Sequence, residues 1–126
     1  MKTIITTKNA PAPIGPYSQA VLTGNTLYTS GQIAINPETN NLVLGDIAKE
    51  TKQVMLNLKA VLEAANMTFE NVIKSSIFIS DMNNFSFIND IYGSYFDDSN
   101  APARETVEVA RLPKSVNVEI SMIAVK

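Results

Sequence analysis

The C-terminal segment, residues 116–125, constrains the fold more than any other part of the chain. One face carries four alternating apolar side chains, Val116, Val118, Ile120 and Met122. The other face carries two more, Ile123 and Val125. A strand that is apolar on both faces requires burial on both sides. If helices cover only one side of a sheet, self-association can bury the other side, so we infer a homo-oligomer.

The remaining pattern predicts a single α+β domain over residues 1–126, with no internal repeat and no linker. A helix is expected from Asp46, a candidate N-cap, to Asn66, with apolar residues at helical spacing. A second helix is expected over residues 84–96, with an apolar stripe of Phe85, Ile88, Tyr92, Tyr95 and Phe96. Strands are expected over residues 3–7, 17–22, 26–30, 72–80, 104–111 and 116–125. This order favours a mixed sheet with both helices on one face.

Two finer predictions concern single residues in these elements. In the strand over residues 72–80, Ile73, Ile77 and Ile79 are expected to share one face. Gly31 directly follows the predicted strand at 26–30, where a glycine indicates a bulge or a close backbone approach.

The composition excludes several kinds of chemistry. The chain has no histidine and no cysteine, which removes disulfides, thiolate catalysis, cysteine-ligated zinc and the commonest general base. A net charge of −2 disfavours a large phosphate-binding surface, so nucleic acid is not an expected partner. The N-terminus is too short and polar for a signal peptide and no apolar run is long enough for a membrane span, so the expected compartment is the cytoplasm. A Mg²⁺ or Ca²⁺ site made of carboxylates alone stays open, but no loop of EF-hand spacing and no phosphate-loop or dinucleotide motif is present, so neither a metal nor a cofactor is expected.

Arg104 and Glu119 are the first candidates for a binding or catalytic site. A guanidinium group presents a permanent charge and a planar fork that suits a carboxylate. Glu119 lies in an apolar stretch, where burial would alter its proton affinity. The alternatives are a surface arginine paired with Glu105 or Glu108, and an edge carboxylate facing water or a neighbouring subunit.

Asn89 and Tyr17 are less obvious candidates. Asn89 falls within the apolar stripe of the second predicted helix, where an amide needs a partner from the protein or from a ligand. The alternative is a structural amide bound to the backbone. Tyr17 follows a loop rich in proline and glycine, where a phenol lines a pocket or caps the core. The serines, Ser30 among them, have no histidine partner, which excludes a hydrolytic triad.

Several segments in order resemble the RidA family of enamine/imine deaminases, also called YjgF/YER057c/UK114. The resemblance covers nearly the whole chain and rests on the segments Ala12-Pro13-Ile14-Gly15-Pro16-Tyr17-Ser18-Gln19, Thr29-Ser30-Gly31-Gln32-Ile33, Asn89-Asp90-Ile91-Tyr92, Tyr95-Phe96, Pro102-Ala103-Arg104, Val107 to Pro113 and Val118-Glu119-Ile120. It implies a chorismate-mutase-like fold, two helices on one face of a mixed sheet, and a homotrimer with clefts between subunits.

The resemblance also implies an activity. It is the hydrolysis of 2-imino acids, such as 2-iminobutanoate and 2-iminopropanoate, to 2-oxo acids and ammonia, without a cofactor or metal. These imines arise from enamines released by dehydratases that use pyridoxal phosphate.

Applied to this chain, the resemblance implies that Arg104 binds the substrate carboxylate and that Glu119 positions or activates the attacking water. Tyr17 would line the cleft from a neighbouring subunit, and Asn89 would support the site. The ligand would also be contacted by Ser30 and by backbone groups of Gly31 and Thr106.

One departure from the family stands beside the site arginine, where members usually carry a small residue and this chain has Glu105. On an alternating strand Glu105 points away from Arg104, whereas a bulge would bring its charge into the cleft. Three other functions stay open: a 2-oxo acid sensor without catalysis, an RNA-acting protein and a purely structural trimer.

Overall fold

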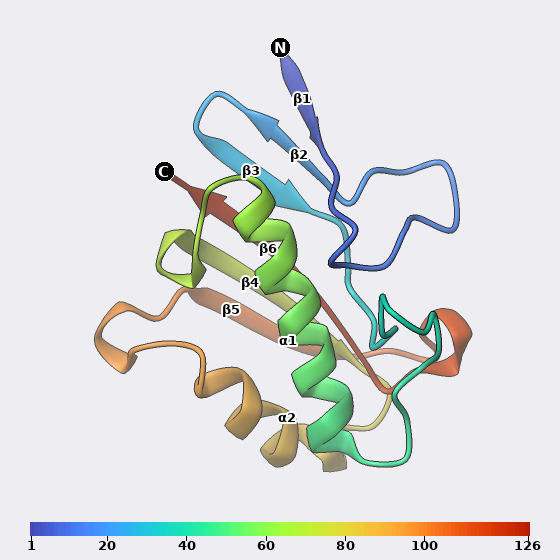
Figure 1. The fold of residues 1–126 in the computed structure, drawn as a ribbon. Coiled ribbons are helices and arrows are strands. Elements are labelled where there is room, and N and C mark those ends of the chain that lie inside the picture. Colours follow the sequence, from blue (N-terminus) through green and yellow to red (C-terminus); the bar gives the residue numbers. More distant parts are fainter.

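Six strands form one mixed sheet in the order β1-β2-β3-β6-β4-β5 (Figure 1). The computed structural model describes all residues, 1–126. The strands are β1 (Lys2–Ile5), β2 (Ala20–Thr23), β3 (Thr26–Thr29), β4 (Val72–Ile79), β5 (Ala103–Glu108) and β6 (Val118–Val125). Neighbours pair antiparallel except β4 and β5, which are parallel. The C-terminal strand β6 is therefore central, as its apolar sequence requires, and β5 is an edge strand.

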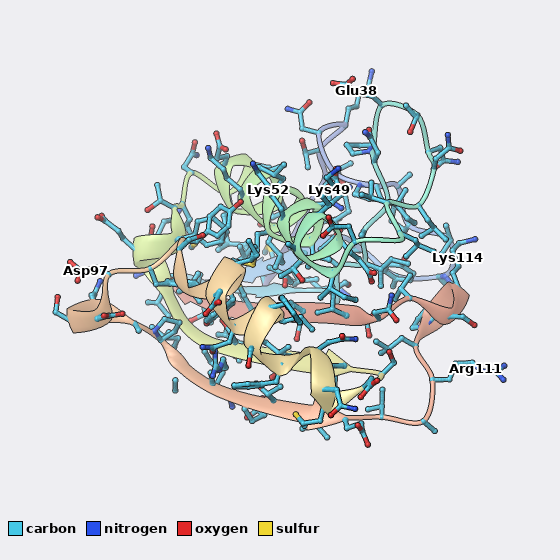
Figure 2. All side chains as sticks on the ribbon, turned by 90° about the horizontal axis from the view of Figure 1, so that it is seen from below. Glu38, Lys49, Lys52, Asp97, Arg111 and Lys114 are labelled. Carbon is cyan, nitrogen blue, oxygen red and sulfur yellow. The ribbon has the colours of Figure 1, made fainter.

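Both helices, α1 (Ile47–Ala64) and α2 (Phe85–Gly93), cover the same face of the sheet, which confirms the α+β prediction (Figure 1). The Asp46 side chain accepts a hydrogen bond from the Lys49 backbone N–H and caps α1. Asn66, with φ of 58°, ends it. The exposed Lys49 and Lys52 project from the side of α1 that faces away from the sheet (Figure 2). Neither helix is long and apolar enough to cross a membrane.

The main core lies between the helices and the sheet. On β6, Val118, Ile120, Met122 and Ala124 are fully buried against α1, whose inward residues include Val54, Leu58 and Val61. The alternate residues of β6, from Glu119 to Val125, point to the opposite face and are only half-buried. That face also exposes 49% of Tyr28 and 42% of Val107. One chain alone therefore leaves the second face of its central strand open to solvent.

The sequence prediction was wrong at Ile73 and imprecise at several ends. A register shift between Val72 and Lys74 bulges β4, and Ile73 is 53% exposed while Ile77 and Ile79 are buried. The α2 helix ends at Gly93 rather than residue 96. Beyond it, Tyr95 and Phe96 still pack on the core, with ring centroids 5.2 and 5.4 Å from that of Phe69. Short 3₁₀ turns occupy Phe69–Asn71, Met82–Asn84, Asp98–Asn100 and Pro113–Ser115.

Candidate functional site

Arg104 extends from the edge strand β5 toward α2. Its register partner on β4 is Ser75, which is buried under α2 and accepts a hydrogen bond of 2.8 Å from the Tyr92 hydroxyl. The guanidinium carbon lies 5.2 Å from the centroid of the Tyr92 ring and 5.7 Å from that of Phe85. Two aromatic rings of one helix thus bracket the charge, a stabilising arrangement for arginine. Burial raises the pKa of Tyr92, partly offset by Ser75 and Arg104.

Asn89 holds the guanidinium from the helix side. Arg104 donates a hydrogen bond of 2.7 Å from Nη1 to the side-chain oxygen of Asn89. The amide in the apolar stripe therefore has a side-chain partner, not a backbone one. Asn89 fixes one nitrogen of the fork, and the remaining N–H groups stay available to a ligand.

No carboxylate neutralises Arg104. The one ion pair of the chain joins Lys74 to Glu105 at 2.9 Å, and Glu108 accepts a hydrogen bond from the Met82 backbone N–H. The alternative of a surface arginine paired with Glu105 or Glu108 is therefore wrong. The structure instead shows an oriented cation with no counter-charge, which is an arrangement suited to binding an anion.

Glu105 points away from Arg104. It pairs in register with Ser76, hydrogen-bonds its hydroxyl and binds Lys74, all on the open face of the sheet. These two partners hold the pKa of Glu105 below its usual range. No bulge interrupts β5, so the charge of Glu105 stays out of the Arg104 site. Thr106 shares the face of Arg104, and its buried hydroxyl oxygen has no hydrogen-bond partner.

A second group of candidate residues lies on the open face of the sheet. It is a pocket of about 440 Å³ that contains Glu119, Tyr17, Ser30 and Gly31 and has three apolar walls, Ile14, Ile33 and Pro113. Tyr17 is 49% exposed, and its hydroxyl accepts a hydrogen bond from the Ile14 backbone N–H at 3.3 Å. The Ser30 hydroxyl donates to the Ser18 carbonyl, which leaves only its lone pairs for a ligand.

Glu119 is the only carboxylate that lines this pocket. Burial raises the pKa of Glu119, and neither a hydrogen bond nor a cation offsets the effect. Gly31 lies directly against it: a Cβ atom at Gly31 would be 2.8 Å from Glu119 Cδ. The backbone at Gly31 is therefore closely approached, and the approaching group is the side chain of the candidate carboxylate.

Arg104 and Glu119 are on opposite faces of the sheet within one chain. Arg104 is in register with Ser75 and Glu119 with Phe78, three residues apart on an unbulged part of β4. Side chains an odd number of residues apart on a strand point to opposite faces. The predicted residues therefore form two groups, Arg104 with Asn89 and Thr106, and Glu119 with Tyr17, Ser30 and Gly31.

Sequence reasoning missed several residues of these two groups. Phe85 and Tyr92 were expected to be core residues, yet they also bracket Arg104, and the apolar walls Ile14, Ile33 and Pro113 were not singled out. No single-residue pattern marks such walls, because they come together only through folding. No group of three or more acidic side chains is placed to hold a metal ion.

Comparisons with known proteins place this geometry in a family. A family model described as Endoribonuclease L-PSP matches residues 7–126. A RutC family protein of Pyrococcus horikoshii is 52% identical over 126 residues, covering 100% of this chain and 99% of that protein. A Bos taurus protein named 2-iminobutanoate/2-iminopropanoate deaminase is 48% identical, covering 100% of this chain and 91% of that protein.

Solved structures agree with the sequence relatives. The crystal structure of E. coli TdcF with bound serine has a TM-score of 0.92 and 42% identity, covering 98% of this chain and 98% of that chain. The fold, the matched length and these identities lead to one conclusion: the chain belongs to the RidA/YjgF/RutC family.

Proposed function

We propose that the protein hydrolyses small 2-imino acids, such as 2-iminobutanoate and 2-iminopropanoate, to 2-oxo acids and ammonia. The observation that carries this proposal is the unpaired guanidinium of Arg104, fixed by Asn89 between two aromatic rings. A relative at 48% identity bears the name of this activity. A second relative is described with bound serine, a molecule that also has a carboxylate next to a carbon bearing nitrogen.

In this mechanism Arg104 binds the substrate carboxylate through the N–H groups that Asn89 leaves free. The bound fork orients the neighbouring imine carbon, which is already electrophilic and becomes more so when the nitrogen is protonated. Holding the reactants in place lowers the barrier without a covalent nucleophile.

Glu119 supplies the proton transfers. Its carboxylate takes a proton from a water as the water oxygen bonds to the imine carbon. The C=N electron pair moves to nitrogen, and Glu119 returns the proton to that nitrogen. In the resulting carbinolamine, Glu119 takes the hydroxyl proton as the C=O bond forms and passes it to the nitrogen, so that the C–N bond breaks and ammonia leaves. Imino acid and water are thus converted to oxo acid and ammonia, and the raised pKa of Glu119 suits a group that accepts and returns a proton.

We also propose that the working site forms between two copies of the chain, in a homotrimer with three clefts. Two observations support it: Arg104 and Glu119 face opposite sides of the sheet, and the Glu119 side is uncovered and partly apolar. A second copy that covers the open face would bring its own Arg104 toward Glu119 and bury the exposed face of β6. We expect this trimer to act in the cytoplasm.

A coupled assay tests the activity. A threonine dehydratase generates 2-iminobutanoate in the presence of semicarbazide, which traps the imine, and wild type is compared with Arg104→Ala. We expect wild type to lower semicarbazone formation and Arg104→Ala to leave it unchanged. Equal semicarbazone formation with and without folded, oligomeric wild type would refute the deaminase proposal.

A mixing experiment tests the shared site. Arg104→Ala and Glu119→Gln chains are each expected to be inactive, and co-expression with two affinity tags yields mixed trimers. If each cleft takes Arg104 from one chain and Glu119 from the next, about a quarter of the clefts in random 1:1 trimers are intact. A site built within one chain would show no recovery at all.

The same variants separate the other functions. A 2-oxo acid sensor predicts that Glu119→Gln binds 2-oxobutanoate as wild type does, with no turnover in either protein. An RNA-acting protein, as the description of the family model suggests, predicts RNA cleavage that survives stringent repurification. A purely structural trimer predicts that Arg104→Ala alters neither binding nor turnover.

A further inference from the structure

Two fully buried polar residues on α1, Glu50 and Asn57, are used by none of the steps above. Their exposed fractions are 0% and 1%. They are seven residues apart, close to two helical turns, so both lie on the side of α1 that faces the sheet. A polar side chain in that position costs stability unless it is fully hydrogen-bonded, so its partners indicate its purpose.

Glu50 binds the beginning of the strand that carries Glu119. Its Oε2 accepts hydrogen bonds from the backbone N–H groups of Asn117 at 2.7 Å and Val118 at 3.2 Å. Its Oε1 accepts a third bond, of 2.8 Å, from the Asn117 side-chain amide. The carboxylate therefore fixes the two backbone units that directly precede Glu119.

Asn57 binds the segment that follows Gly31. Its side-chain amide nitrogen donates to the carbonyls of Ile33 at 3.1 Å and Ile35 at 3.0 Å. Gln53, one turn earlier on α1, donates to the Asn57 oxygen at 2.9 Å. That bond fixes the orientation of the amide, so that its nitrogen faces the two carbonyls.

The two segments held by α1 meet where Gly31 lies against Glu119. Gln32 and Ile120 bridge them through paired backbone hydrogen bonds of 2.8 and 3.2 Å. The contact is so close that a methyl group at Gly31 would force the Glu119 side chain to move. A small shift of either segment therefore moves the Glu119 carboxylate within its pocket.

We propose that Glu50 and Asn57 are positioning residues that set the place of the Glu119 carboxylate against Gly31. Neither lines the Glu119 pocket, and α1 acts as a rigid spacer between their two attachment points. The inference rests on the proposed function of Glu119. The competing explanation is that both residues only satisfy buried backbone groups and thereby stabilise the fold.

Steady-state kinetics of four variants separate these explanations. Glu50→Leu leaves two backbone N–H groups and the Asn117 side-chain amide without this acceptor. The Asn57→Ser side chain is too short to reach both carbonyls. Glu50→Gln keeps an oxygen that can accept both backbone bonds. Val61→Ala is the control, because Val61 is equally buried in α1 but packs only in the core.

We expect Glu50→Leu and Asn57→Ser to lower kcat about 10- to 100-fold, since a misplacement near 1 Å has an effect of that order. KM should change little, because Arg104 belongs to the other half of the site. Glu50→Gln should retain most of kcat, and Val61→Ala should lower the melting temperature with kcat unchanged. The proposal would be overturned if folded Asn57→Ser and Glu50→Leu trimers kept the wild-type kcat. It would also be overturned if Val61→Ala, destabilised as much as these variants, lost kcat to the same extent.

A measurement without turnover keeps this test apart from the test of the deaminase itself. The Glu119 carboxyl carbon is followed by ¹³C NMR of glutamate-labelled protein, with Glu119→Gln assigning its signal. Release of Glu119 toward solvent should bring its pKa down toward the ordinary glutamate value in Glu50→Leu and Asn57→Ser, but not in Val61→Ala. An unchanged titration in both variants refutes the positioning role even if wild type proves to have no deaminase activity.

Discussion

Replacing Gly31 by alanine tests the tightest contact of the candidate site. The new Cβ would lie 2.8 Å from Cδ, 2.9 Å from Cγ and 2.9 Å from Oε2 of Glu119. Gly31 does not have a left-handed φ, since only Gly24 and Gly45 do among the glycines. The backbone therefore accepts alanine without strain, and the whole effect falls on the Glu119 side chain.

The size of the effect follows from these distances. Carbon atoms prefer separations of about 3.5–4.0 Å, so the carboxylate must retreat by roughly 0.7 Å or more. A displacement near 1 Å costs about 100-fold in a reaction that depends on alignment, so we expect kcat to fall about 10- to 100-fold. Glu119 is half-buried and can rotate toward the open side of its pocket, so stability should fall by no more than about 1 kcal/mol, the low end for an overpacked site.

The semicarbazide-coupled assay measures kcat and KM for Gly31→Ala, and thermal unfolding measures its stability. Gly93→Ala is the matched control, because a Cβ there meets nothing within 4 Å. We expect the control to keep wild-type kinetics. If Gly31→Ala has a wild-type kcat while a structure shows the methyl in place, then the position of Glu119 does not govern the reaction and the argument fails.

Four further outcomes are expected. Arg104→Lys should raise KM about 10-fold or more, because an ammonium group forms no bidentate pair and a charge-assisted bond contributes about 1.5–3 kcal/mol. Asn89→Ala should raise KM by a smaller factor, since it frees the Arg104 guanidinium without removing it; light scattering should show an unchanged assembly state. Glu105→Ala should leave kcat and KM unchanged, because its charge faces away from Arg104 and is already paired with Lys74. Turnover should decline as the pH falls through the raised pKa of Glu119, since protonation removes the base. A pH profile of kcat should show this acidic decline at a pH above the ordinary glutamate pKa of about 4.3. A decline at the ordinary value would contradict the effect of burial.

Local sequence patterns were enough to predict most of the secondary structure. The Asp46 cap and the alternation along β6 each depend on a few neighbouring residues, and both occur as expected. The bulge at Ile73 was missed because it depends on how β4 pairs with β6, and the alternation of one strand does not contain that register.

Polar residues within apolar stripes were the most informative signal for the site. Asn89 was recognised in this way, and the structure gives it Arg104 as a partner. Glu50 and Asn57 interrupt the stripe of α1 in the same manner and could have been singled out by the same rule. The backbone groups that Glu50 and Asn57 bind are at least 67 and at least 22 residues away along the chain, so no local pattern identifies them.

By itself the sequence determined the α+β class, the buried central strand and the side-chain types available for chemistry, because these depend on composition and on periods of two or 3.6 residues. For Glu105 the sequence left two possibilities, an alternating strand or a bulge, and the unbroken register of β5 decided for the first. Only the tertiary structure decided that Arg104 has no counter-charge, that Gly31 lies against Glu119, and that Arg104 and Glu119 face opposite sides of one sheet. The physical reason is that each of these facts is a relation between segments distant in the chain, set by strand register and by the packing of α1 and α2.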